Sequence, residues 1–128
     1  MLDPLGPGGS NLYRRAGHDL ASDQALDPEP EAAPPSCVVI VDGVFLHRDE
    51  LADVWHFSVF LRVPFEETVK RMARRDGTPA DPSHPMLHRY VQGQRLYFAQ
   101  CSPEHRASIV IDSWNLDRPR VVDAAHRP

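Results

Sequence analysis

Three short apolar runs constrain the fold of this chain most, because each has the composition of a strand buried on both faces. They are CVVIVDG at residues 37–43, FSVFLRV at residues 57–63 and SIVID at residues 108–112. Such runs are typical of parallel sheets that carry helices on both sides. We therefore predict about three parallel strands at these positions.

Helical patterns lie between these runs. Residues 64–77, PFEETVKRMARRDG, combine an opening proline, acidic residues in the first turn, arginines in the last turn and a terminal glycine. These are the start and stop signals of a helix. Residues 85–101 predict a second helix, and residues 48–55 a short helix at most. The order of strands and helices is that of an α/β domain.

The first 36 residues differ in character from the rest of the chain. They hold six of the 13 prolines and four of the seven glycines, and they show neither a helical nor a strand period. We expect an irregular N-terminal arm at residues 1–36 and a single α/β domain at residues 37–128. The glycine-rich stretch LDPLGPGGS has no strand before it and no lysine after it, so it predicts a turn-rich connection rather than a phosphate loop.

Composition limits the classes of partner. The formal net charge is -4, with acidic and basic residues mixed along the chain, which argues against nucleic acid as a partner. No run approaches the roughly 18 apolar residues of a membrane span, so we expect no membrane partner and a cytoplasmic location. Cys37 and Cys101 lie far apart and are most simply core residues.

Two patterns carry possible chemistry. Asp42 ends the first apolar run, and an acid at the carboxyl edge of a parallel sheet is suited to hold Mg²⁺ near a transferred phosphate. The alternative is a simple Asp-Gly turn. Arg71, Arg74 and Arg75 precede a loop rich in glycine, proline and aspartate, a pattern that suits a hinged lid near residues 71–85 whose guanidinium groups reach phosphate. The alternative is a solvated helix end.

Three stretches taken in order resemble a known family. VVIVDGVFLHRDEL, VFLRVPFEETVKRMARRDG and RYVQGQRLYFAQCSPEHRASIVID resemble the carboxyl-terminal part of uridine kinase-like proteins, in the P-loop kinase superfamily. The resemblance implies an incomplete P-loop kinase-like parallel sheet flanked by helices. It also implies transfer of the γ-phosphoryl group of ATP, with Mg²⁺, to the 5′-hydroxyl of uridine or cytidine.

The resemblance also assigns roles to individual residues. Asp42 matches an acid followed by glycine, which implies a catalytic role and a role in holding the metal. Arg71 and Arg75 match arginines of the lid that face the phosphates of ATP. HDLASD, residues 18–23, resembles the nucleoside-contacting stretch and places His18, Asp19 and Asp23 near the substrate, although His18 and Asp23 differ from the residues of the family there.

The phosphate loop of the family has no counterpart in this sequence. The first strand of the family, its G-x-x-x-x-G-K-[ST] loop and its general-base aspartate would all precede Met1. We therefore expect little or no kinase activity from this chain alone. We also expect an unpaired sheet edge that invites another chain, including a homo-oligomeric partner. The alternatives are a non-catalytic interaction module derived from half of a kinase, and an unrelated small α/β binding domain.

Overall fold

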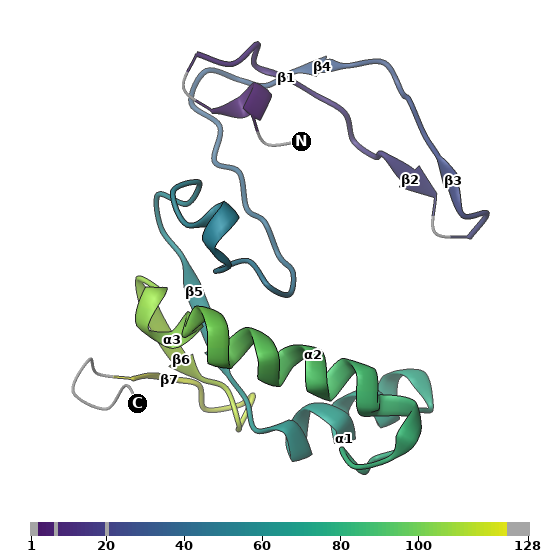
Figure 1. Ribbon diagram of the computed structural model, residues 1–128. Coiled ribbons are helices and arrows are strands. Elements are labelled where there is room, and N and C mark those ends of the chain that lie inside the picture. Colours follow the sequence, from purple (N-terminus) through teal and green to yellow (C-terminus); the bar gives the residue numbers. More distant parts are fainter. Residues whose placement is uncertain (1–2, 7, 20, 123–128) are drawn as a thin grey trace. The chain divides into compact units, whose positions relative to one another are not determined.

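A computed structural model describes residues 3–6, 8–19 and 21–122 of the chain (Figure 1). The protein is of mixed α/β class and divides into two compact units, Met1–Asp42 and Gly43–Pro128. Each unit has its own strands, and the three helices lie in the second unit. Among the described residues, no helix is both long enough and apolar enough to cross a membrane.

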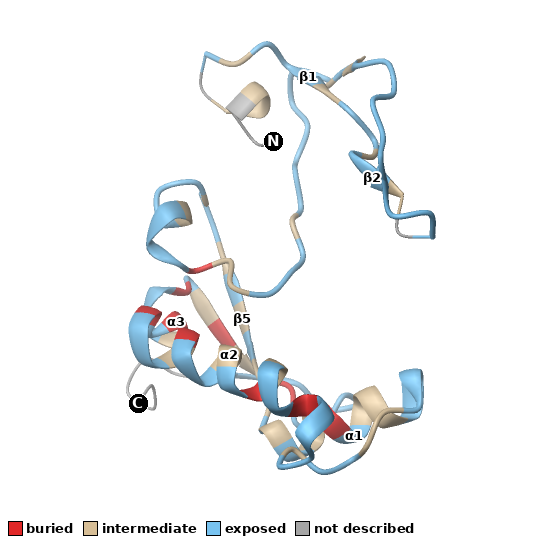
Figure 2. Cartoon of the chain, turned by 45° about the vertical axis from the view of Figure 1, so that its right-hand side comes forward, coloured by how far each residue is buried: buried red, intermediate tan, exposed pale blue. Residues whose placement is uncertain are grey.

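The first unit is built from short antiparallel pairings. After a 3-10 turn, η1 (Asp3–Leu5), the strand β1 (Leu12–Tyr13) pairs with β4 (Glu31–Ala32), and β2 (His18–Asp19) pairs with β3 (Gln24–Ala25). The sequence predicts only an irregular arm here, because two-residue strands leave no periodicity to detect. None of the described side chains of this unit is buried (Figure 2), so hydrogen bonds and ion pairs rather than a core fix its shape.

The predicted first strand is not formed. Residues 37–43 contain no strand, and Val38 and Ile40 are 86% and 89% exposed. The prediction of a buried strand here is wrong, and so is the core position predicted for Cys37, which is exposed. The physical reason is that a strand needs a partner for its backbone groups, and no described strand pairs with this run.

The sheet of the second unit follows the other two apolar runs. Its order is β5-β6-β7, with β5 at Val59–Arg62, β6 at Ile109–Asp112 and β7 at Arg120–Val122. β5 and β6 are parallel, as predicted, whereas β7 is antiparallel to β6. The sheet therefore has two parallel strands rather than three. The short strand β7 was not predicted.

The helices begin and end close to where the sequence predicts. Helix α1 (Phe65–Asp76) follows Pro64, and Gly77 closes it in the left-handed conformation, with φ 69° and its N–H bonded to the carbonyl of Ala73 at 3.0 Å. Helix α2 (Pro85–Cys101) starts at the predicted proline. A one-turn helix, α3 (Pro103–Arg106), follows it, and the segment before β5 forms only a 3-10 turn, η2 (Asp49–Leu51).

The hydrophobic core lies between the helices and one face of this sheet. Val69 of α1 is fully buried and packs with Leu87 and Val91 of α2. On the sheet, Val110 is fully buried, and Phe60 contacts Phe98 of α2 edge to face at 5.9 Å. In Figure 2 the buried residues accordingly gather on the helices and central strand of the second unit. This core fixes α1 against the sheet, and α1 carries the predicted arginines.

Candidate functional site

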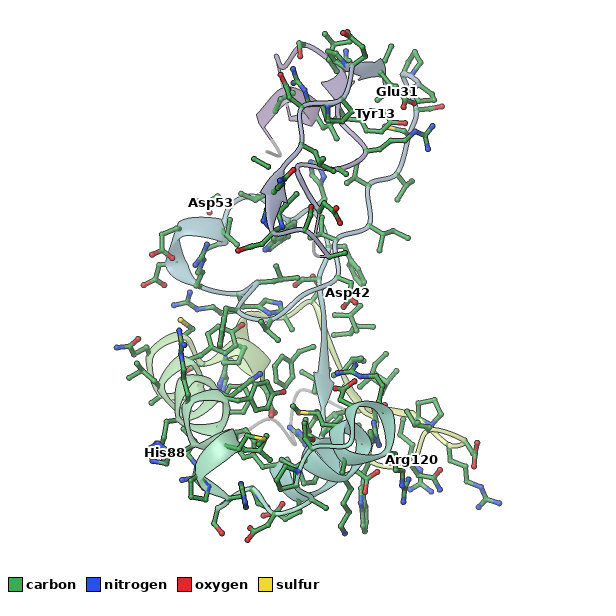
Figure 3. The ribbon with its side chains drawn as sticks, turned by 90° about the vertical axis from the view of Figure 1, so that its right-hand side faces the viewer. Tyr13, Glu31, Asp42, Asp53, His88 and Arg120 are labelled. Atoms are coloured by element: carbon green, nitrogen blue, oxygen red, sulfur yellow. The ribbon has the colours of Figure 1, made fainter. Side chains whose placement is uncertain are left out.

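Asp42 and the lid arginines belong to different units. Asp42 is the last residue of the first unit, where it is exposed and outside any strand (Figure 3). Arg71 and Arg75 lie one turn apart on α1, in the second unit. A site that these residues share therefore stays a prediction.

Of the three residues predicted to contact a nucleoside, two are in contact and the third bonds within the turn beside them. Nε2 of His18 on β2 lies 3.1 Å from Oδ1 of Asp23. The carboxylate of Asp19 accepts hydrogen bonds from the Ser22 hydroxyl at 2.6 Å and from the Ala21 N–H at 3.0 Å. These two bonds, the first above all, hold the pKa of Asp19 below its ordinary value. The hairpin of β2 and β3 thus pairs an exposed imidazole with the carboxylate of Asp23, while the carboxylate of Asp19 is bonded within the turn.

A polar contact fixes the base of the same hairpin. The hydroxyl of Tyr13 on β1 donates to Glu31 on β4 at 3.2 Å, and the two are seen close together in Figure 3. Arg15 also pairs with Glu31, through Nε at 2.5 Å and Nη2 at 2.8 Å. The guanidinium of Arg15 lowers the pKa of Glu31. The carboxylate of Glu31 therefore links both strands of the hairpin.

Arg71 has a well-defined structural position at the end of the sheet. Its Nε donates to Glu67, one turn earlier on α1, at 3.0 Å. Its Nη2 donates to the carbonyl oxygens of Ser113 and Trp114 at 2.8 and 2.9 Å. Those two residues directly follow β6, so the guanidinium lies at the carboxyl end of a parallel strand, the edge at which open α/β sheets bind ligands.

Arg75 is engaged differently. Its side chain is 76% exposed, and its Nε and Nη2 each lie 2.8 Å from a carboxylate oxygen of the adjacent Asp76. This two-point contact raises the pKa of Arg75 and lowers that of Asp76. An anionic ligand at Arg75 would have to compete with that carboxylate.

A groove lies between α1 and the segment that follows β6. It is open to solvent, and its volume is about 470 Å³. The helix contributes charged side chains and the loop contributes an indole, an amide, an aliphatic group and a carboxylate. The lining residues are Glu67, Arg71, Arg74, Trp114, Asn115, Leu116 and Asp117.

Side-chain hydrogen bonds hold the loop that forms one wall of this groove. Oδ1 of Asp112 accepts from the N–H of Trp114, and Oδ1 of Asn115 accepts from the N–H of Asp117, both at 3.0 Å. Such Asx turns stabilise a loop locally. Trp114, at 66% exposure, is thereby held in a fixed loop with much of its side chain open to solvent.

Arg74 is the cation of this groove that remains available. It is exposed, and within the described part of the chain no hydrogen bond or ion pair engages it. The carboxylate of Glu67 is already bonded to Arg71. An exposed indole can stack on a planar ring, and a guanidinium can pair with phosphate oxygens. The groove therefore offers an exposed indole and, within the described residues, an unpaired guanidinium in its lining.

The arginine pattern of the sequence predicts Arg74, but no pattern pointed to Trp114 or Leu116. The available signal was their position, because SWNLD directly follows the apolar run SIVID, and residues after a parallel strand lie at the ligand-binding edge of a sheet. Only the bonds from Arg71 reveal that α1 forms the opposite wall.

A second open groove of about 570 Å³ contains none of the catalytic or binding residues predicted from the sequence. It lies between α2 and the segment around η2, and it is lined by Phe45, Arg48, Asp49, Glu50, Gly93, Leu96, Tyr97, Gln100 and Cys101. Within residues 3–6, 8–19 and 21–122, no group of three or more His, Cys, Asp or Glu side chains is arranged so that it could hold a metal ion.

Comparison with known proteins gives no relative. No family model, no curated protein and no solved structure matches this chain.

Proposed function

We propose that this chain is part of a uridine kinase-like domain and that the groove between α1 and residues 114–117 receives the base and phosphates of ATP. The observation that carries the proposal is the position of Arg71. It bonds to the carbonyl groups directly after β6, so an arginine-bearing helix meets the carboxyl end of parallel strands. This is where nucleotides bind in open α/β folds.

The contacts divide the proposed roles among the arginines. Arg71 is already bonded to Glu67 and to two carbonyls, so it positions the wall of the groove. Arg74 has no such partner among the described side chains and would meet phosphate. The exposed indole of Trp114 would stack on the base. Arg75 would reach phosphate only by leaving Asp76.

The remaining parts of the proposed reaction lie in the first unit. The exposed carboxylate of Asp42 is of the type that Mg²⁺ prefers, and it would hold that ion or its bound water. His18, Asp19 and Asp23 present donors and acceptors that would bind the hydroxyl groups of uridine or cytidine. Because the sequence carries no G-x-x-x-x-G-K-[ST] loop, we propose that the chain alone transfers little or no phosphate.

Binding of ATP tests the proposal directly. Titration of the full chain with ATP and Mg²⁺ should quench the tryptophan fluorescence, and Trp114→Phe should abolish most of the change. Arg74→Gln should weaken binding about tenfold, because a charge-assisted hydrogen bond is lost. Arg89→Gln, an exposed arginine on α2 outside the groove, is the matched control and should bind as the unmodified chain does.

Two results would refute this function. One is the absence of any ATP-dependent change in fluorescence or in thermal stability. The other is equal weakening by Arg74→Gln and Arg89→Gln, because that would show attraction by overall charge rather than binding in the groove.

A further inference from the structure

The sheet of the second unit ends in an unprotected strand. β5 is an edge strand, and β6 is its only strand partner in the described part of the chain. An edge strand presents a row of backbone N–H and C=O groups, which proteins usually shield with prolines, charges or a covering segment. Three of its four residues, Val59, Phe60 and Leu61, offer neither a charge nor a proline along this edge, and the fourth, Arg62, is paired with Glu104.

One face of the same sheet is apolar and partly uncovered. The register places Val59 and Leu61 of β5 beside Ile109 and Ile111 of β6, and Ile111 beside Val121 of β7. All five side chains of this face are apolar. Val59, Leu61 and Val121 are 44%, 57% and 65% exposed, whereas Phe60 and Val110 on the opposite face pack against the helices. That opposite face also carries a row of charged residues, Arg62, Asp112 and Arg120, so the wholly apolar face is the partly exposed one. An exposed apolar sheet face is suited to burial against a partner.

The same chain contains an apolar segment that lacks partners. Residues 38–41, VVIV, consist entirely of β-branched residues, which favour strands. They form no strand, and Val38, Val39 and Ile40 are exposed by 86%, 48% and 89%. Since every side chain in the segment is apolar, both of its faces are suited to burial in a sheet.

We propose that two copies of this chain associate by reciprocal strand exchange, in which residues 38–41 of each copy add to the open edge of β5 of the other. A second copy is the proposed partner because one chain contains both an acceptor edge and a donor segment, and in the described residues neither is paired. Addition supplies the backbone bonds that each lacks, and apolar surface is buried. Reciprocity gives a closed two-fold dimer rather than an open chain of copies.

This inference is independent of nucleotide binding, because neither β5 nor residues 38–41 line the proposed ATP groove. It is tested first by sedimentation velocity of the full chain over a range of concentrations. We expect a monomer–dimer equilibrium. Ile40→Lys should raise the dissociation constant about tenfold or more, since an isoleucine would no longer be buried.

The control is Val44→Lys, which changes a valine of 58% exposure outside the donor segment and should leave the dimer intact. Ile40 is 89% exposed in the single chain, so Ile40→Lys should not unfold it, and circular dichroism checks this. Dissociation of the dimer can therefore be separated from loss of fold.

Disulfide trapping tests the pairing itself. Cys101 is first replaced by alanine, which leaves Cys37, directly before the donor segment, as the one native cysteine. A second cysteine is then introduced either at Ser58, for parallel addition, or at Val63, for antiparallel addition. Under mild oxidation, one of these two proteins should form a much larger fraction of covalent dimer than the protein that has Cys37 alone. A monomer at all concentrations, open-ended aggregates, equal effects of the two lysine variants, or a disulfide within one chain would overturn the proposal.

Discussion

Replacing Arg71 with alanine should destabilise the second unit, because this one side chain joins α1 to the segment after β6. The change removes two bonds to carbonyl groups, at 2.8 and 2.9 Å, and a contact with Glu67 one turn away. Each carbonyl bond contributes about 1 kcal/mol net, and the contact within the helix about 0.3–0.5 kcal/mol. The free energy of unfolding should therefore fall by about 2 kcal/mol.

Urea unfolding followed by circular dichroism measures this loss. With a denaturant dependence of about 1–2 kcal/mol per molar for a domain of this size, the midpoint should move down by about 1 M or more. The matched control is Arg75→Ala on the same helix, where the exposed side chain pairs with the adjacent Asp76, and its midpoint should not move. Equal midpoints for the two variants would refute the role of Arg71 as the link between α1 and β6.

Three further outcomes follow from the core, a helix end and a buried histidine. Val69→Ala should lower the free energy of unfolding by about 2–3 kcal/mol in urea melts, whereas Val44→Ala, at an exposed site, should change it little. Gly77→Ala should cost about 1–2 kcal/mol in the same assay, because φ 69° disfavours a Cβ; an unchanged midpoint would contradict this. Burial, and secondarily Arg106, lowers the pKa of His47, so the unfolded chain binds its proton more readily. Stability should be full above the ordinary histidine pKa of about 6.5 and fall as the pH drops through it, and His47→Gln should flatten that dependence.

The sequence predicted those parts of the site that depend on local signals. Pro64 and Gly77 flank α1 because proline fits the start of a helix and glycine adopts the left-handed closing conformation, and so the arginines on α1 were found. His18 and Asp23 were grouped by resemblance, and they are in contact because only a short turn separates them in the chain. Trp114 was missed, because its importance depends on α1, some forty residues earlier in the chain.

The sequence by itself determined the two long helices, the second and third apolar strands and their parallel order, because each follows from periodicity, caps and β-branched composition read over a few residues. The tertiary structure alone decided which apolar runs become strands. Residues 38–41 are richer in β-branched residues than β5, yet among the described strands only β5 has a neighbour, β6, to receive its backbone hydrogen bonds. A strand is a property of a pair of segments, and one segment read alone does not contain its partner.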